Sequence, residues 1–583
     1  MEGHLVELSQ LTYSHHIVQR LFKDIKGAEE QKRLAKTFRG HTVRLATHAI
    51  GAEVVQTALS SLPMASATLI KSEFYGKEFA LFDDGGQPHS LKAVLESRPD
   101  RRGVVMEHVH GVIVKLVAKS LMKFQFAHEL LWEYFQEASP VQMQELVPQL
   151  VESYMILLST RPGSMAAAMC AAHGGAKERK RMMRSLKGVV ANALLHRDSY
   201  LAVMRLIESV DDTITCQKTI LAELLKPLQG APEDAKGSVP KPAKGSSAEE
   251  WVPRGTTGPQ GNPADGVSDG GGGDGGVTSM EVDEEEGEEG MKEPEGKAVA
   301  EDSGAAPPAM LAVMKSRTGC KILLRLLAPE HTGYLHPEEL DLLKPTMVPA
   351  PASKMAGAEN GAAKEGTPTL VPSSKKEASV RRRELLAYLR EPLREVCASH
   401  AGDLMRSKFA GDLVLQEAIR AIGTPQVVQA VAEAACAKPL EMQLPMYEDP
   451  AGHLFMKQLL KREAEAQQAA ATGDDSGAAA STSWFADALL QHAGGALATW
   501  AGSNRGAFVV SALEQVPSTS AGVRKAFETN AARAKLVKDA KAGSTMGVKV
   551  LAEQLGFGDF GAKEAAAKIE AAHAKRNALK KKV

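Results

Sequence analysis

Apolar residues recur three and four positions apart through most of the chain, which is the spacing of one face of an α-helix. Alternating apolar and polar residues bounded by turn pairs, which would indicate β-strands, are scarce. The pattern therefore predicts an all-α protein.

A short motif recurs along these helical segments: a small residue, two variable residues, two apolar residues, two variable residues and an apolar one. Copies begin at Ser14, Gly51, Ala127, Gly163, Ser199 and Gly319, and weaker ones lie around Ala410, Ala451, Arg505 and Met546. The interval is about 36 residues, and a degenerate copy at residues 89–95 fills the one double gap. Such a period indicates an α-solenoid; a bundle of similar helices is the alternative.

The charge is unevenly distributed along the 583 residues, which are enough for several domains. The chain has 70 basic and 71 acidic residues, but residues 231–310 alone hold 18 acids and 6 bases among glycine and proline. This composition predicts a disordered insertion. The rest of the chain carries +11 and is therefore basic. The Pro/Ala/Gly-rich residues 349–376 predict a flexible linker, and residues 464–481 predict a loop.

Motifs for catalysis, metal binding or membrane insertion are missing from the sequence. The five cysteines are far apart, and none forms a CxxC pair, which excludes a zinc knuckle and a disulfide framework. No nucleotide-binding, serine-hydrolase or zinc-protease motif is present. No stretch is apolar enough for a membrane helix, and residues 1–30 lack a signal-peptide pattern. We expect an intracellular protein without enzymatic activity, cofactor or metal.

The repeated motif, in which glutamine often follows the apolar pair, resembles the base-reading helix of Pumilio (PUF) repeats. Residues 14–19 and 51–56 are the best copies. Segments 5–22, 38–49, 73–82, 175–188 and 380–386 resemble the Puf-A (penguin-like) branch of that family, and 448–460, 500–513 and 543–556 resemble its CPL (penguin-like C-terminal) domain. The segments occur in the family's order over 5–227 and 311–556. The resemblance implies a right-handed α-solenoid of about 36-residue repeats.

The resemblance also divides the chain. The expected parts are PUF-like repeats over 1–227, a disordered acidic linker over 228–308, a further PUF-like repeat over 309–348, a flexible linker over 349–376, a CPL domain over 377–560 and a basic tail over 561–583. The family also has a basic N-terminal tail and first PUF repeats, which are not present before the segment at residue 5. The array is therefore expected to be N-terminally truncated, either as a partial gene model or as a shortened form.

In sequence-specific PUF proteins two side chains of a repeat hydrogen-bond a base edge and a third stacks on it. By this resemblance His15 and Gln19 would read a base edge and His16 would stack. Ala52 and Gln56 hold the edge positions of the next copy, and alanine has no hydrogen-bonding group. Three further pairs give no coherent code: His128/Trp132, Ser164/Ala168 and Tyr200/Met204. The repeats predict little base selectivity, with solvated helix faces as the alternative.

Basic clusters predict contacts to phosphates. The densest contains Lys177, Arg179, Lys180, Arg181, Arg184 and Lys187. A helix would place Lys177, Lys180, Arg181 and Arg184 on one face. Such contacts are independent of base sequence and sensitive to salt. Further basic stretches are Arg39, His41, Arg44 and His48; residues 381–383; and Lys575, Arg576, Lys580, Lys581 and Lys582, which could also be a nuclear address.

These features predict binding of RNA, with DNA as a further ligand, at low sequence specificity. By resemblance to the Puf-A family, the ligand would be an rRNA precursor or an mRNA. The partners would be ribosome-assembly proteins, and the setting the nucleolus or nucleus, in pre-rRNA processing and ribosome biogenesis. Two alternatives stay open: a sequence-specific PUF-type regulator of translation, and an α-solenoid scaffold that binds proteins. The oligomeric state is left open.

Overall fold

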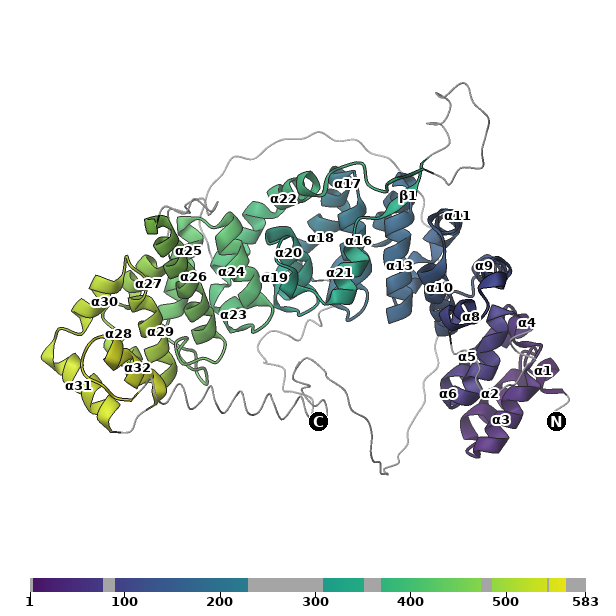
Figure 1. The fold of residues 1–583 in the computed structure, drawn as a ribbon, viewed down its shortest axis with the longest axis horizontal. Helices are drawn as coiled ribbons and strands as arrows, with labels where there is room; N and C mark the ends of the chain where they lie inside the picture. Colours follow the sequence, from purple (N-terminus) through teal and green to yellow (C-terminus); the bar gives the residue numbers. More distant parts are fainter. Residues whose placement is uncertain are drawn as a thin grey trace, which may run out of the picture. The chain divides into compact units, whose positions relative to one another are not determined.

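A computed structural model describes residues 4–76, 90–228, 308–350, 369–472, 485–542 and 545–561. The described residues up to 560 belong to one compact unit, and the boundaries expected near 348 and 377 fall inside it. The described part of this unit is all-α apart from one small ribbon (Figure 1). The core of the predicted acidic insertion and the Lys575–Lys582 cluster lie outside the described residues.

The predicted motif marks a row of helices that pack side by side, so the α-solenoid is confirmed. Each strong or weak copy lies within two residues of a helix start. Along the row, each helix packs against the next. The row consists of α2 (Ser14–Asp24), α5 (Gly51–Ser61), α10 (Gln125–Glu137), α13 (Arg161–His173), α16 (Tyr200–Ser209), α20 (Cys320–Leu327), α24 (Gly411–Ile422), α26 (Gly452–Thr472), α29 (Asn504–Glu514) and α32 (Met546–Gln554). We call it the motif row.

Other helices precede or follow each member of the motif row. Those that precede are α1 (Leu5–Leu8), α4 (Thr42–Ala46), α8 (Leu91–Ser97), η3 (Pro99–Arg101), α9 (Arg102–Ala118), η4 (Val151–Ser153), α12 (Tyr154–Leu157), α15 (Val190–Leu195), α19 (Ala309–Lys315), α22 (Ala378–Ser399), α23 (Ala401–Arg406), α28 (Leu497–Trp500) and α31 (Asn530–Lys541). Those that follow are α3 (Ala28–Thr37), α6 (Met64–Lys71), η2 (Ser72–Tyr75), α11 (Pro140–Leu150), α14 (Ala176–Ser185), α17 (Thr213–Cys216), the π-helical η5 (Gln217–Leu221), α18 (Ala222–Leu224), η7 (Thr332–Tyr334), α21 (Pro337–Leu343), α25 (Pro425–Cys436), α27 (Phe485–Ala493) and α30 (Ser520–Ala526).

The small residue of the motif is explained by a close backbone approach. A Cβ atom on Gly163 would lie 2.2 Å from the carbonyl oxygen of Leu157, six residues earlier. Where serine takes this place, it uses the same geometry, since the Ser199 hydroxyl donates to the Ala193 carbonyl at 2.7 Å. The same spacing relates Gly51 to Leu45, Gly319 to Val313, Gly452 to Met446 and Gly506 to Trp500. Larger side chains would push the two helices apart.

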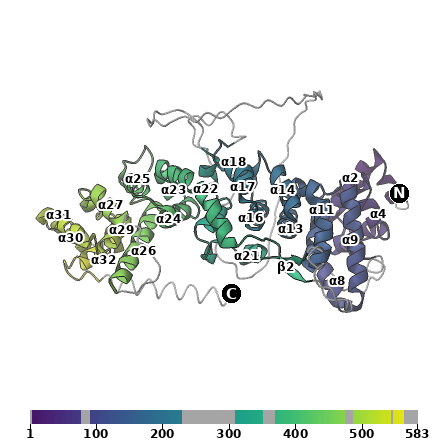
Figure 2. The ribbon, with the colours of Figure 1, turned by 90° about the horizontal axis from the view of Figure 1, so that it is seen from above.

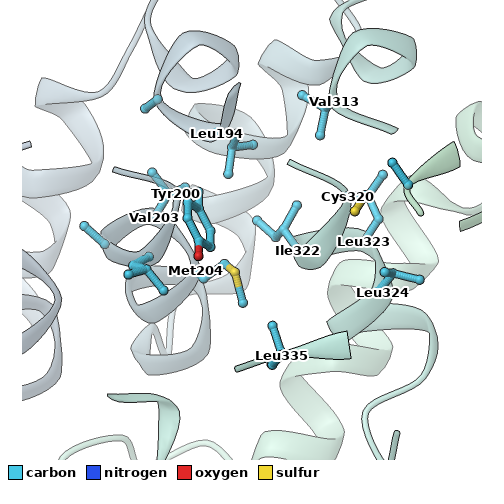
Figure 3. Close-up of a cluster of buried hydrophobic side chains, with 14 of the residues drawn as sticks. Leu194, Tyr200, Val203, Met204, Val313, Cys320, Ile322, Leu323, Leu324 and Leu335 are labelled. Carbon is cyan, nitrogen blue, oxygen red and sulfur yellow. The ribbon is translucent and has the colours of Figure 1, made fainter. Parts of the chain in front are cut away.

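The solenoid continues across the acidic insertion, as the motif at Gly319 predicts. The backbone on either side meets where the Ala309 N–H donates to the Lys226 carbonyl at 2.8 Å. Buried side chains from both sides then form one core (Figure 3). Tyr200 and Met204 of α16 face Ile322 of α20 in this cluster. The insertion therefore interrupts the sequence but not the stack of helices.

Two segments differ from their expected conformation. The end of the predicted linker at 349–376 is ordered, because β1 (Met347–Pro349) pairs antiparallel with β2 (Leu370–Pro372). β1 packs on α11, and α21 lies beside α16 close to the ribbon (Figure 2). The first part of the predicted loop at 464–481 is helical, since α26 runs to Thr472. Alanine, which dominates there, is the strongest helix former.

Buried glutamates close the open N-termini of short helices. The Glu73 carboxylate accepts hydrogen bonds from the N–H groups of Gly40, Thr42 and Val43 at the start of α4. Glu463 of α26 does the same for α27 and accepts from Phe485 at 2.7 Å. Because the first N–H groups of a helix have no partner within it, such a carboxylate acts as a cap supplied by another helix.

The cap at Glu463 should make stability depend on pH. Burial raises the pKa of Glu463 to about 7, although two N–H groups favour its ionised form. The folded state therefore binds the proton more tightly than the unfolded state, and the stabilisation is lost as pH rises from about 4.5 to 7. We expect wild type to lose roughly 3 kcal/mol over this range relative to Glu463→Gln. Urea unfolding at stepped pH measures this difference.

Glu465→Gln is the matched control, because this exposed side chain lies two residues further along the same helix. Its unfolding curve should keep the wild-type pH dependence. If the curves of wild type and Glu463→Gln ran parallel from pH 4.5 to 7.5, the assignment of the proton to Glu463 would be wrong.

Candidate nucleic-acid interface

The predicted cationic face exists on α14, the helix that follows α13. Lys177, Lys180, Arg181 and Arg184 are all exposed, while the opposite face is buried through Met182 and Met183. Lys187, just after the helix, is also exposed. Among these cations, Arg181 forms an ion pair with Glu152, whose side chain is 79% exposed. We call the four exposed cations of α14 the basic stripe.

Arg179 does not belong to the phosphate-binding set in which the sequence placed it. It points to the buried side of α14 and is 3% exposed. Its guanidinium donates to the carbonyls of Ala171, Ala172 and Ser373. Arg179 therefore joins α13 to the segment after β2 and has a structural role.

A cavity of about 240 Å³ lies beside the basic stripe, between α14 and the end of α16. Lys177 and Lys180 line it on one side, and Asp211 and Asp212 on the other. Hydrogen bonds from the hydroxyl and N–H of Thr215 lower the pKa of Asp212. The ionised carboxylates weaken the positive potential at this edge, and Glu152 does the same at Arg181, so Arg184 is the least opposed member of the stripe.

The base-reading positions expected in α2 are only partly accessible. His15 is 6% exposed, its Nδ1 lies 3.0 Å from the Leu11 carbonyl, and its Nε2 lies 3.5 Å from the Glu53 carboxylate. His16 is exposed, and Gln19 is half-buried beside it. His15 is therefore occupied by contacts within the protein, and His16 is the one fully exposed member of the predicted trio.

Further along the motif row, most base-reading side chains are buried or bonded to a neighbouring repeat. The Gln56 side chain accepts a hydrogen bond from the Phe126 N–H at 3.1 Å and so joins α5 to α10. His128 is fully buried, between the Thr160 hydroxyl at 2.7 Å and the Met122 carbonyl. The other buried positions are Ala52, Ser164, Ala168, Tyr200 and Met204. These side chains pack neighbouring repeats together and do not face a ligand.

Among the remaining predicted basic residues, some are exposed and others are buried. Arg44 and His41 are exposed, whereas Arg39 is half-buried and its Nη2 atom is fully covered. Arg381 is 3% exposed, and residue 383 of the same stretch is exposed. The basic stretches therefore supply both surface charge and buried guanidinium groups.

A cluster that the sequence analysis missed lies in the turns before α20 and α24. Phe409 is 54% exposed and adopts a left-handed backbone with φ 66°. Lys408 lies 4.6 Å and Arg317 lies 5.7 Å from the centre of its ring. A bulky residue in this conformation is strained, and such strain is concentrated at functional sites. The cluster presents an exposed aromatic ring with two cations close to it.

The repeat register was the signal that could have revealed this cluster. Arg317 and Phe409 each stand two residues before the glycine of the motif, at Gly319 and Gly411. Exposed Arg161 and Arg197 occupy the equivalent place in the two preceding repeats. Arg161 is paired with Glu338 at 2.9 Å, and Arg197 is 85% exposed at its side chain.

Neither a cluster of metal ligands nor a membrane-spanning helix is present among the described residues. Within these ranges, no three His, Cys, Asp or Glu side chains gather as metal ligands would. In the same part of the chain, no helix has the length and apolar character of a membrane span. The five cysteines are unpaired thiols, and four of them are buried.

Comparison with protein families finds a match to the CPL (NUC119) domain over residues 364–471. The matched range overlaps the CPL domain predicted at 377–560, but it begins before residue 377 and ends before residue 560. "Pumilio homolog 3" of human is 22% identical over 562 residues, covering 94% of this chain and 68% of the human protein. The rat protein of the same name is 22% identical, covering 88% of this chain and 63% of the relative. This chain therefore matches about two thirds of the length of these relatives.

Two solved structures share the fold. Human Puf-A matches with a TM-score of 0.65 and 20% identity over 95% of this chain and 85% of that one. A second crystal structure, of human Puf-A in complex with DNA, matches with the same TM-score, identity and coverage.

Proposed function

Since the chain is a Puf-A-like Pumilio-repeat protein with a CPL domain, we propose that it binds RNA through the phosphate backbone with little base selectivity. One observation carries the proposal: the basic stripe is exposed while most base-reading positions are buried. Phosphate contacts give affinity, and contacts to base edges give specificity. A surface with exposed groups for phosphate contacts and few accessible groups for base contacts should bind many sequences.

DNA is a second ligand of the proposed interface, because duplex and single-stranded DNA carry the same phosphates. The similar structure of human Puf-A in complex with DNA supports this extension. The resemblance to the Puf-A family further supports a place in the nucleolus, in pre-rRNA processing and ribosome assembly. This cellular role rests on the family resemblance and not on the geometry of the site.

Phe409 adds a contact for unpaired bases to the proposed function. An exposed aromatic ring can stack on any base, and neighbouring cations can hold the adjacent phosphates. Arg317 and Lys408 both lie close to this ring, at 5.7 and 4.6 Å from its centre. Bases within a duplex are already stacked, so this contact should favour single strands.

Fluorescence anisotropy with unrelated single- and double-stranded RNAs at several salt concentrations tests the proposal. We expect similar affinities across sequences and a steep salt dependence. Phe409→Ala should weaken binding of single strands by about 10-fold and leave duplex binding unchanged, because only unpaired bases can stack. A strong preference for one short motif would instead favour a sequence-specific regulator.

A protein-binding scaffold is the second candidate function, and one loop favours it. Between α25 and α26, Leu440, Met442 and Leu444 are exposed by 71%, 105% and 48%. Exposed apolar side chains gathered in one loop are typical of protein-binding surfaces. If the folded wild type bound none of the RNAs at low salt, this function would replace the first.

A further inference from the structure

A second basic site lies in a cavity of about 390 Å³ where α16, the β1–β2 ribbon and the start of α22 meet. Six cationic side chains and two carboxylates line it, and one of the cations, Lys376, is paired at 2.6 Å with Glu384 outside the lining, which leaves a surplus charge of +3. The cations are Arg205, Arg325, Lys375, Lys376, Arg381 and Arg382, and the carboxylates are Glu208 and Glu377. None of them belongs to the basic stripe.

The arginines of this cavity share one carboxylate and otherwise donate to neutral groups. Glu208 serves two of them, since Arg325 Nε lies 3.2 Å and Arg382 Nη2 lies 3.3 Å from its oxygens. Arg205 donates to the Thr346 hydroxyl, and Arg381 donates to the Val210 carbonyl at 2.7 Å. One deeply placed carboxylate therefore faces four guanidinium groups.

Two donors in the cavity have no protein acceptor. The Nε atoms of Arg205 and Arg382 are fully covered and form no hydrogen bond. Arg205 is 97% buried, because 3% of its surface is exposed. Burial lowers the pKa of Arg205 to about 10; Glu208 opposes this effect, and the charges of Arg179 and Arg381 add to it. Unpaired buried donors are rare in folded proteins, and an unbalanced buried charge is costly.

We propose that this cavity binds a small phosphate-bearing molecule that joins the β1–β2 ribbon and α22 to the PUF-like repeats. Phosphate oxygens would accept hydrogen bonds from the guanidinium groups that line the cavity, whose planar geometry matches that of phosphate. The bound anion would also offset the surplus positive charge. This inference goes beyond RNA binding, because it assigns a ligand that stabilises the fold.

The size of the cavity favours a small ligand over a nucleic-acid chain. A volume of about 390 Å³ falls in the range of pockets for small molecules. The cations come from segments far apart in sequence, namely Arg205 before the acidic insertion, Arg325 after it and Arg382 after the linker. A ligand held by all three would connect these segments.

Isothermal titration of the full chain with sodium tripolyphosphate tests the proposal. We expect one molecule to bind per chain and to raise the melting temperature. Arg382→Gln should weaken this binding at least about 10-fold, because it removes one guanidinium group from the lining of the cavity. Lys375→Gln on the exposed lip of the cavity is a second variant, which should weaken binding without loss of a buried contact. Arg383→Gln is the matched control on the same helix, exposed and outside the cavity, and should bind as wild type does.

Three results would overturn the proposal: no binding at about 1 mM tripolyphosphate, equal binding by wild type and both cavity variants, or equal weakening by Arg383→Gln. Competition identifies the source of the phosphate. Displacement of tripolyphosphate by a 5′-phosphorylated oligonucleotide, but not by its 5′-hydroxyl form, would overturn the small-molecule assignment in favour of a nucleic-acid end. Displacement by neither would support it.

Discussion

Replacing Lys177, Lys180, Arg181 and Arg184 together by glutamine is expected to weaken RNA binding on the order of 100-fold at 0.1 M salt, for all sequences alike. Each phosphate contact releases condensed counterions and adds about 0.7 to 0.9 to the salt slope. Four lost contacts should therefore lower the slope by about 3. Anisotropy titrations across a salt series measure both quantities.

The fold should survive this change. All four side chains are exposed, and the ion pair that is lost, between Arg181 and Glu152, lies at the surface. Exposed pairs contribute about 0 to 1 kcal/mol to the free energy of unfolding. Circular dichroism and the melting temperature should match those of wild type.

A charge-matched control separates the site from the net charge. Lys525, Lys535, Lys538 and Lys541 are exposed on α30 and α31 in the C-terminal part of the unit. Their replacement by glutamine removes the same four charges. A small loss of RNA affinity for this variant and a large loss for the stripe variant would assign the site to α14. Equal losses for both, or unchanged affinity of the stripe variant, would contradict it.

Most of the fold could be predicted from the repeated motif, because the contacts that the motif reflects join residues close in sequence. A small residue is needed wherever the helix start approaches the carbonyl six residues earlier, and this need repeats with the period. The motif therefore located the helices of the motif row even where its apolar positions were weak. The ribbon escaped prediction because its pairing depends on distant partners. Ser374 after β2 donates to Asp211 at 2.7 Å, a contact that no pattern within 349–376 reveals.

The candidate site was predicted only as far as helical periodicity reaches. The exposed face of α14 follows from spacing, and the same spacing turns Arg179 away from it. That Arg179 meets carbonyl groups of α13 and of Ser373 depends on the packing of α14. His15 shows the same limit, because its Nε2 contacts Glu53 in the next repeat. Residue type identifies a candidate ligand contact, but the neighbouring repeat decides whether the side chain is accessible.

Gly163→Ala is expected to lower the local stability around α13 by about 3 kcal/mol, through overpacking and lost hydrogen bonds. The new Cβ would lie 2.2 Å from the Leu157 carbonyl, 2.7 Å from His128 Nδ1 and 2.9 Å from Thr160 Oγ1. The last two atoms form the 2.7 Å contact between the α10 and α13 repeats. Thr160 also caps α13 by accepting from the Gly163 N–H. The substitution therefore strains one backbone contact and disrupts two hydrogen bonds.

Gly111→Ala provides a control of opposite sign. Gly111 lies inside α9, and no atom lies within 4 Å of the place its Cβ would take. Alanine is a better helix former than glycine, so this variant should gain about 0.5 to 1 kcal/mol. Hydrogen exchange of the amides in each helix measures both effects locally, which suits a solenoid whose repeats can open separately. If Gly163→Ala protected α13 as well as wild type does, the close approach would not explain why the motif keeps a small residue, and the repeat would need another physical cause.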